Sequence, residues 1–307
     1  MKRYVWVDTD IAISDVFALT SAFNLPNIEI VGISTVFGRR SVDENYENAK
    51  KLLSLLNKTN INVYKGASKP LIVDTHFDDN KLDIPYNSTI KDTNESAIDA
   101  LYKKAKELNG ELTVVSIAPL TNIASAIFKY PDIVKYIKEI VYGGGSVGKG
   151  GSYTLAAEKN TYFDPHAAQS VFKSGVPVTM IGLDVMMESY LNNKEIDLLK
   201  EIKGDIGILI NKATSSMINS SKKLKGVDKL FLFDLCPFLY VNKPSIYKGR
   251  KAGVYVETES PLSMGRTVSD IFVHADELFK VKNVMVMIEA DNNIISKEVL
   301  DSFSIYR

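Results

Sequence analysis

Short runs of β-branched residues alternate along this 307-residue chain with longer segments whose apolar residues recur at helical spacing. The first run, YVWVDTD, is followed by the helical pattern SDVFALTSAFNL, and IEIVGISTVFG is followed by SVDENYENAKKLLSLL. Later runs such as LTVVSIAP and VPVTMIGLD also contain almost no polar residues. Such strands are typical of a parallel sheet that helices cover on both faces. The pattern therefore predicts an α/β fold with a mostly parallel central sheet.

No repeat or low-complexity segment divides the chain, so we expect residues 1–307 to form a single domain. Residues 192–245 are predicted to form consecutive helices, which would be a cap or helical insertion on the sheet. Two late segments, VYVETESPLSMGRTVSD and VKNVMVMIEAD, are predicted to contain further strands.

The composition argues against several classes of function. The 37 basic residues balance 37 acidic ones and form no long run, so nucleic acid is not an expected partner. Cys236 is the only cysteine, which rules out an internal disulfide and a thiolate zinc site. The apolar stretch near the N-terminus is too short for a signal-peptide core or a membrane span. We expect a cytoplasmic protein with no membrane partner.

Polar residues gather where the predicted strands end, at Asp8 and Asp10 and at residues 38–40, 116–121 and 143–145. Ligands of open parallel sheets bind outside the carboxyl ends of the strands. The functional site is therefore expected at this edge of the sheet.

Asp8, Asp10 and Asp15 lie within eight positions of one another where the first strand meets the first helix. Ser14 is predicted to be the N-cap of that helix, and Asp15 in its first turn would complement the helix dipole. The dipole does not account for Asp10. Carboxylates this close repel one another unless a positive group lies among them, and a hard cation with oxygen ligands is the simplest candidate.

Two other cation-dependent patterns share part of this motif. An EF-hand loop needs glycine at its sixth position and glutamate at its twelfth, where this chain has Ile13 and Leu19. Haloacid-dehalogenase-type phosphotransferases also place D-x-D after an apolar strand, but they have Thr or Val where Ala12 stands here. No later strand ends convincingly in the acidic pair that this second class requires.

Taken together, the motifs resemble those of the nucleoside hydrolases, calcium-dependent enzymes that hydrolyse the N-glycosidic bond of ribonucleosides. The family's first strand ends in D-T-D-x-G-x-D-D-A-x-A-L, and residues 8–19 read DTDIAISDVFAL. Matching segments follow in the family's order: SIAPLTNIA at 116–124, GGG at 143–145, AAEKNTYFDPHAA at 156–168, VTMIGLDV at 178–185, FDLCP at 233–237 and GRTVSD at 265–270. The resemblance implies a homodimer or homotetramer that acts on a small-molecule nucleoside in purine salvage.

The resemblance also implies a metal site. Asp10, Asp15, Asp234 and the backbone carbonyl of Ile117 would bind Ca²⁺, and Asp10 would take the proton of the attacking water. An oxocarbenium-like transition state needs an anion near the sugar ring, a nucleophilic water and help for the departing base, so such a site suits the reaction. From the residues alone, Asp234 could instead be a helix cap.

Glu158 and Asn160 match family positions that hydrogen-bond the ribose hydroxyls, although a polar surface turn would also suit this segment. Other positions depart from the family pattern. Ser14 replaces an aspartate that binds the ribose 2′-hydroxyl, and Arg39 and Ser152 replace asparagines near the sugar. Lys159 replaces a phenylalanine. The substrate site is therefore expected to keep its metal ligands while its recognition of the sugar has changed.

Phe233 stands where many members carry a histidine that protonates the leaving base. None of the three histidines, His76, His166 and His274, aligns there, although His76 lies near the family's substrate loop. Without this acid, purine nucleosides are favoured, because solvent can protonate a purine at its ring nitrogen. Phe233, Phe238 and Tyr240 could stack on the base or simply pack in the core. Against a purine preference, the one tryptophan, Trp6, lies within the first strand.

Two functions stay open. The first is a calcium-dependent ribonucleoside hydrolase that prefers purines. The second is a protein of the same fold that binds a sugar-like, modified or phosphorylated ribosyl ligand and has little activity on standard nucleosides. Arg39 and Arg40 favour a more anionic ligand because they add positive charge near the sugar.

Overall fold

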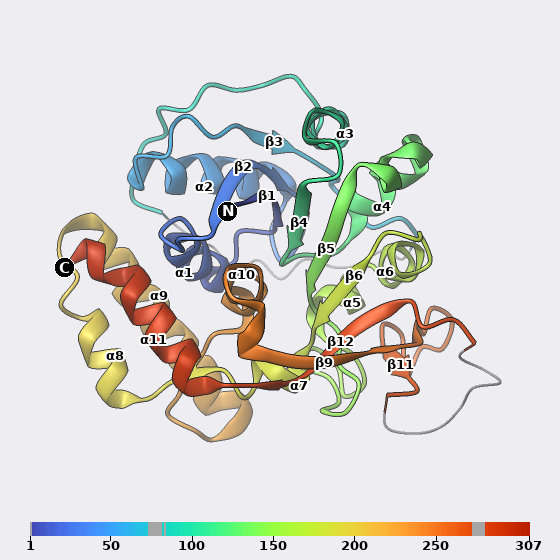
Figure 1. Ribbon diagram of the computed structural model, residues 1–307. Coiled ribbons are helices and arrows are strands. Elements are labelled where there is room, and N and C mark those ends of the chain that lie inside the picture. The colour runs from blue at the N-terminus through green and yellow to red at the C-terminus, as the bar shows by residue number, and fades with distance from the viewer. Residues whose placement is uncertain (1, 73–81, 83, 272–279) are drawn as a thin grey trace.

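The computed structural model describes residues 2–72, 82, 84–271 and 280–307. Within these residues an eight-stranded sheet has the order β3-β2-β1-β4-β5-β6-β12-β9 (Figure 1). Its strands are β1 (Arg3–Thr9), β2 (Ile28–Thr35), β3 (Val63–Lys65), β4 (Leu112–Ser116), β5 (Ile137–Gly143), β6 (Val178–Ile181), β9 (Tyr247–Ala252) and β12 (Val284–Ala290). Every neighbouring pair is parallel except β12 and β9. The predicted mostly parallel α/β fold is confirmed.

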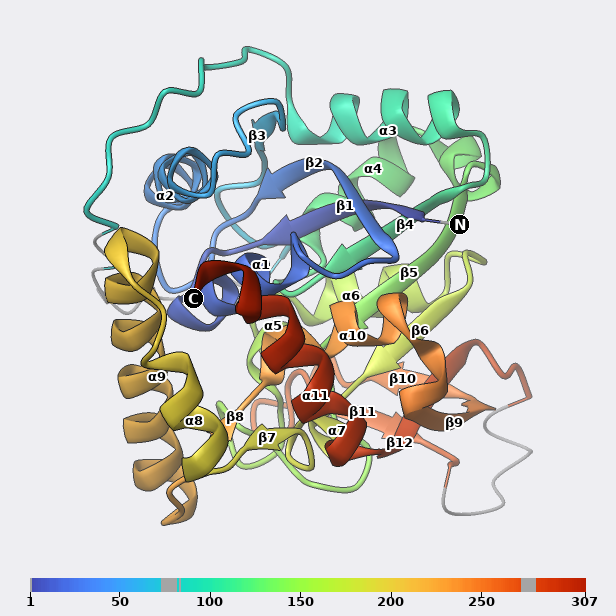
Figure 2. The same ribbon diagram turned by 60° about the vertical axis from the view of Figure 1, so that its left-hand side comes forward.

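Helices cover both faces of this sheet (Figures 1 and 2). One face carries α3 (Ala97–Leu108), α4 (Thr121–Lys129) and α6 (Pro165–Phe172). The other carries α1 (Ile13–Ala22), α2 (Val42–Leu55), α8 (Asn193–Leu199), α9 (Gly204–Lys225), α10 (Cys236–Asn242) and α11 (Asn292–Phe303). Successive side chains of β1 point to opposite faces of the sheet, each of which has its own hydrophobic core. Val5 and Val7 pack on the second face, and Trp6 packs on the first. A strand buried on both sides has no polar face, which explains why the middle of β1, residues 5–7, is apolar.

The expected helical insertion is present and contains two short strands. After α7 (Leu183–Met186), β7 (Tyr190–Leu191) pairs antiparallel with β8 (Leu230–Phe231), and α8 and α9 lie between these strands. A 3-10 turn, η2 (Phe233–Leu235), then leads into α10. Because α9 and η2 both pack against α1, the insertion brings residues near 220–234 to the carboxyl end of β1.

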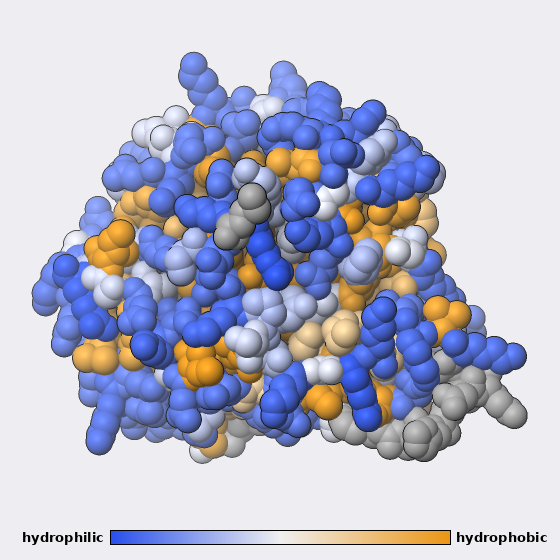
Figure 3. All heavy atoms as spheres, in the orientation of Figure 1, coloured by the Kyte–Doolittle hydropathy of each residue, from blue (hydrophilic) through white to orange (hydrophobic). Residues whose placement is uncertain are grey.

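The late strands divide between two sheets. Residues 284–290 form β12 in the central sheet, whereas β10 (Val254–Val256) and β11 (Thr267–Ser269) form a separate antiparallel pair. Hydrophilic side chains cover most of the face seen in Figure 3, and hydrophobic ones lie between them in small groups, as is usual for a protein surface. No helix in the described part of the chain is long and apolar enough to cross a bilayer.

The prediction that Ser14 caps the first helix is wrong. Helix α1 begins at Ile13 with Ala12 at its N-cap, and no side chain caps it. The chain turns earlier than the sequence suggested, because Ile11 takes a left-handed conformation with φ of 43°. Ser14 therefore lies inside the first turn, and it lines the same cavity as Asp234.

Candidate active site

The turn after β1 is held by side chains from three parts of the chain. The hydroxyl of Thr9 accepts a hydrogen bond from the amide of Ile11 at 3.0 Å and donates one to Oδ2 of Asp15 at 2.5 Å. Nη2 of Arg40 donates to the carbonyl of Ile11 at 2.6 Å. Arg40 therefore supports the strained residue of the turn, a role that its sequence position did not reveal.

Asp8 has a structural environment. Its Oδ1 accepts hydrogen bonds from Oγ of Ser34 at 2.5 Å and from Nδ2 of Asn122 at 2.7 Å. Burial raises the pKa of Asp8 to about 7, against the opposing effect of these two donors. These contacts join β1 to β2 and α4 where the strands end. They fix the end of β1, and Asp10 follows two residues later at the same edge of the sheet.

Asp10, Asp15 and Asp234 form a buried acidic cluster at this edge. Their exposed fractions are 1%, 0% and 8%, respectively. Burial, followed by the charges of Asp234 and Asp10, raises the pKa of Asp15 well above its usual value. Oδ1 of Asp15 is buried without a hydrogen-bond partner. The alternative role of Asp234 as a helix cap is wrong, because the residues at the N-caps of η2 and α10 are Leu232 and Leu235.

Lys159 supplies a positive charge to this cluster. Its Nζ lies 3.2 Å from Oδ2 and 3.5 Å from Oδ1 of Asp10. Burial alone would lower the pKa of Lys159, but the charges of Asp10, Asp234 and Asp15 outweigh it and raise the pKa above its usual value. The sequence showed only that a lysine replaces a phenylalanine here, so this ion pair across 149 positions was not foreseen.

The acidic cluster suits a metal ion in the kind of donor it offers. Carboxylate and carbonyl oxygens are the ligands of hard cations, and the unpartnered Oδ1 of Asp15 is a donor in need of one. The backbone amide of Ile117 donates to the carbonyl of Asp8 at 2.9 Å, which places Ile117 beside the end of β1. As the side chains are arranged, however, no group of three acidic, His or Cys residues in the described ranges could hold a metal. Among the described residues, Lys159 forms an ion pair with the carboxylate of Asp10, and Nη2 of Arg40 lies 3.4 Å from the backbone carbonyl of Asp10.

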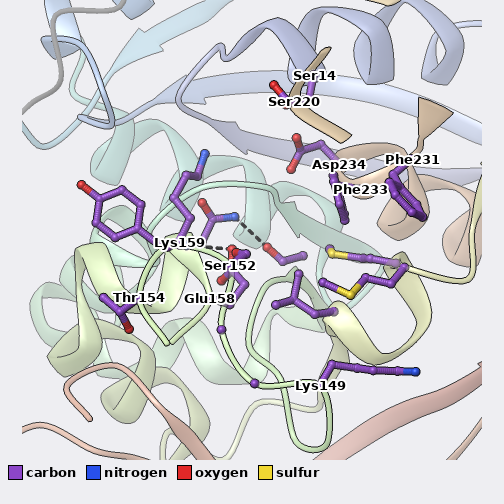
Figure 4. A pocket seen from close by; sticks show the side chains of 18 of the residues that line it. Ser14, Lys149, Ser152, Thr154, Glu158, Lys159, Ser220, Phe231, Phe233 and Asp234 are labelled. Carbon is purple, nitrogen blue, oxygen red and sulfur yellow. Dashed lines mark hydrogen bonds between the residues drawn. The ribbon is translucent and has the colours of Figure 1, made fainter. Parts of the chain in front are cut away.

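A cavity of about 670 Å³ lies beside the acidic cluster, with Asp234 and Lys159 in its lining (Figure 4). All the residues expected to bind substrate line it, and they are Ser14, Arg39, Ser152, Glu158, Asn160 and Phe233. Lys159 and Asp234 line it as well. Asp10 is buried and does not itself line the cavity. Lys159, whose ammonium contacts the Asp10 carboxylate, does line it.

Glu158 and Asn160 are buried, so the surface-turn interpretation of this segment is wrong. Glu158 is the N-cap of α5 (Lys159–Phe163) and accepts hydrogen bonds from the amides of Asn160, Thr161 and Gly145 at 2.9 to 3.1 Å. Burial raises the pKa of Glu158, and these donors oppose the rise. Nδ2 of Asn160 donates to the carbonyl of Gly143 at 2.7 Å, and its Oδ1 is buried without a partner. The two side chains join the end of β5 to α5.

Two phenylalanines form an aromatic wall of the cavity. The rings of Phe231 and Phe233 stack with centroids 5.5 Å apart, and both residues line the cavity. Phe231 was not foreseen. Neither Phe238 nor Tyr240 lines the cavity, so of their two possible roles the packing role applies: Phe238 is fully buried in the core, and Tyr240 hydrogen-bonds Glu139.

Two further positive side chains, Arg39 and Lys149, line the same cavity. The guanidinium of Arg39 lies 6.0 Å from the ring centroid of Tyr153, and Lys149 lines the cavity 3.6 Å from Glu188. His166 lies on α6 and does not line the cavity. The other two histidines, His76 and His274, lie outside the described residues.

Comparison with known proteins agrees with this geometry. The model of the inosine-uridine preferring nucleoside hydrolase family matches residues 5–296. The pyrimidine-specific ribonucleoside hydrolase RihA of Shewanella baltica is 30% identical over 314 residues, which cover 100% of this chain and 98% of that protein. An uncharacterized protein of Schizosaccharomyces pombe is 34% identical over 275 residues, or 86% of this chain and 88% of that one.

Solved structures resemble this one over the same extent. The purine-preferring ribonucleoside hydrolase from Gardnerella vaginalis superimposes with a TM-score of 0.90 at 28% sequence identity, over 99% of both chains. A superposition over nearly the whole of both chains supports the fold and the family together. The chain belongs to the nucleoside hydrolase family, whose enzymes are nucleoside N-ribohydrolases.

Proposed function

We propose that the protein hydrolyses the N-glycosidic bond of ribonucleosides, with purine nucleosides preferred and Ca²⁺ as its metal. The observation that carries this proposal is one cavity lined by Asp234 of the acidic cluster, by Lys159, which pairs with Asp10, and by the stacked Phe231 and Phe233. The named relatives support hydrolysis of ribonucleosides but differ in the base, since one is pyrimidine-specific and another purine-preferring. The base preference therefore rests on the residues of this chain.

The sugar half of a nucleoside would lie over the acidic cluster. Asp234, Glu158 and Asn160 offer the ribose hydroxyls charged and amide oxygens, and Ser14 offers a hydroxyl. Negative charge below the ring stabilises the oxocarbenium-like transition state more than the neutral substrate, which is how a charged site accelerates the reaction. Asp10 would accept the proton of the attacking water as general base.

Asp10, Asp15, Asp234 and the carbonyl of Ile117 would hold the metal. When bound, Ca²⁺ would supply a positive centre that polarises the water and orients the ribose hydroxyls. The chain's own contribution is to keep the carboxylates buried and correctly turned, through Thr9 and Arg40, so that a cation gains more from them than it would at the surface.

The base would stack against the aromatic wall. Among the described residues no histidine lines the cavity, and in this proposal solvent protonates the departing base. A purine accepts a proton at its ring nitrogen and spreads charge over two rings, whereas a pyrimidine offers less to protonate. Stacking on Phe233 and Phe231 would favour the larger ring system.

A second candidate follows from the positive side chains in the same cavity. Arg39, Lys149 and Lys159 all line it, although a neutral nucleoside needs none of them. A modified or phosphorylated ribosyl compound would pair with these groups. The two candidates share the fold and the acidic cluster, but the second binds such a ligand and has little activity on standard nucleosides. For either one, we propose a homodimer or homotetramer as the assembly.

Release of base should be measured from inosine, guanosine, adenosine, uridine, cytidine and inosine 5′-monophosphate, with chelator and with added Ca²⁺. We expect turnover of the purine nucleosides in calcium and its loss in chelator. Faster turnover of uridine or cytidine would contradict the purine preference, and faster turnover of the monophosphate would favour the second candidate. Absence of turnover for all six compounds at every calcium concentration would rule out the hydrolase and leave the second candidate, a protein that binds its ribosyl ligand without hydrolysing standard nucleosides.

A further inference from the structure

Lys159 occupies the place in the acidic cluster where a cation is needed. The side chain reaches Asp10, whose carboxylate is almost fully buried, and approaches both of its oxygens. The opposite charges of Asp234 and Asp15 act on the same ammonium. A buried carboxylate without a positive partner is costly, so the lysine stabilises the cluster when nothing else does.

The main chain of Lys159 is firmly placed. It is the first residue of α5, and the preceding Glu158 is tied to the amides of Gly145, Asn160 and Thr161. The ammonium can therefore move only by rotation of the side chain. Because Lys159 also lines the cavity and its side chain is 18% exposed, space for that rotation lies directly beside it.

A metal ion and this ammonium need the same oxygens. Ca²⁺ binds carboxylate oxygens at about 2.3–2.6 Å, and the ammonium nitrogen lies 3.2 Å from Oδ2 of Asp10. Two positive charges cannot share so small a buried space without strong repulsion. In the present arrangement no three His, Cys, Asp or Glu side chains of the described residues are grouped so as to hold a metal, and Nζ of Lys159 is in contact with Asp10.

We propose that Lys159 is a built-in counter-ion of the acidic cluster, which a metal must displace from Asp10 in order to bind. This inference rests on the metal site of the proposed function. It makes Lys159 a residue that sets the affinity for the metal: the ion must replace the contacts of the ammonium as well as form its own. The displaced side chain would turn into the cavity, toward the bound ribosyl ligand.

Calcium binding to the chelator-treated full-length chain tests the proposal directly, by titration calorimetry and without substrate. Lys159→Met removes the ammonium and keeps the length of the side chain. We expect this variant to bind Ca²⁺ about tenfold more tightly than the wild type, or better, and to melt at a lower temperature in chelator. Lys159→Arg, which keeps the charge, should not show the tighter binding.

Lys149→Met is the matched control, because Lys149 lines the same cavity but pairs with Glu188 instead of the acidic cluster. Its calcium affinity should equal that of the wild type. An equal gain in Lys149→Met would mean that the general charge of the cavity, and not the contact with Asp10, governs binding, and the proposal would be overturned.

The other outcomes separate this inference from the proposed function. Equal calcium affinity of the wild type and Lys159→Met overturns the counter-ion role and leaves a calcium-dependent hydrolase intact. Absence of calcium binding in both proteins overturns this inference and the proposal that the protein uses Ca²⁺. Base release in chelator would still support the hydrolysis of nucleosides. Should Lys159→Met fail to fold, crystals of the wild type with and without Ca²⁺ decide. With metal bound, Nζ must leave Asp10, and an unchanged contact overturns the proposal.

Discussion

Gly38 lies so close to Asp10 that a β-carbon on Gly38 would stand 2.1 Å from Oδ2 of the carboxylate. Real β-carbons do not approach other atoms so closely, so any larger residue must displace Asp10 or the loop that contains Gly38. The absence of a side chain at position 38 is thus part of what orients the proposed general base.

Gly38→Ala should lower kcat/KM for inosine by about 100-fold. The added β-carbon would displace the carboxylate of Asp10, and a displacement of about 1 Å can reduce the rate of catalysis by that factor. We expect a loss of unfolding free energy of about 1–3 kcal/mol from overpacking. Gly110→Ala is the control, since position 110 has open space around it but a φ of 91° that strains an alanine. That variant should lose stability and keep its kcat/KM, whereas equal activity losses would show a general effect of destabilisation.

Asp10→Asn should abolish general-base catalysis while the fold remains. The amide has the shape of the carboxylate but cannot take a proton at neutral pH, so we expect the rate of single-turnover inosine hydrolysis to fall by about 10²–10⁴-fold. Circular dichroism and the melting temperature would check the fold. A variant that turns over inosine at the wild-type rate would show that Asp10 is not the base.

Phe233→Leu should reduce kcat/KM for inosine by about 3- to 10-fold, which corresponds to the loss of one aromatic stacking contact. The effect on uridine should be smaller, so the ratio of purine to pyrimidine turnover should fall. Phe238→Leu is the control because Phe238 is fully buried in the core. It should lower the melting temperature and leave the ratio unchanged, and a similar change of ratio in both variants would argue against a base-stacking role.

Asp99 links α3 to α4 and gives the fold a measurable pH dependence. Its Oδ1 accepts hydrogen bonds from Nζ of Lys129 at 2.6 Å and from the hydroxyl of Tyr130 at 2.7 Å. Chiefly because of Lys129, the pKa of Asp99 is lowered from 3.8 to about 2. A lowered pKa means that the stabilisation is present above about pH 4 and is lost as the pH falls toward 2.

Asp99→Asn should therefore cost about 1 kcal/mol of unfolding free energy at pH 7, a value at the upper end for a partly exposed ion pair. The cost should shrink between pH 4 and pH 2. Urea unfolding of both proteins across this range measures the difference. A cost that stays constant with pH would show that the charge of Asp99 is not its source.

Much of the fold could be predicted because its signals are local. Strands buried on both faces are mostly apolar, and the apolar residues of amphipathic helices recur every 3.6 residues. Runs such as YVWVDTD, alternating with helical segments, therefore indicate a parallel α/β sheet without knowledge of contacts. The same logic locates Asp10 and Asp15 at a strand end, since carboxylates there are not needed for packing.

Other features depend on parts of the chain that are distant in sequence. The start of α1 was misplaced because Arg40 and Thr9 stabilise a left-handed Ile11, which no local pattern announces. Phe231 was missed because the turn at η2, rather than helical spacing, decides which aromatic rings face the cavity.

The sequence by itself determined the layered sheet, the acidic edge and the family resemblance, because each rests on residue types at short spacing. Only the tertiary structure decided which cation meets Asp10. Lys159 is 149 positions away from Asp10 in the sequence, and the sequence of its neighbours Glu158 and Asn160 was equally compatible with a surface turn. Burial changes the outcome: away from water, three carboxylates need a positive partner, and the fold brings the ammonium of Lys159 to Asp10.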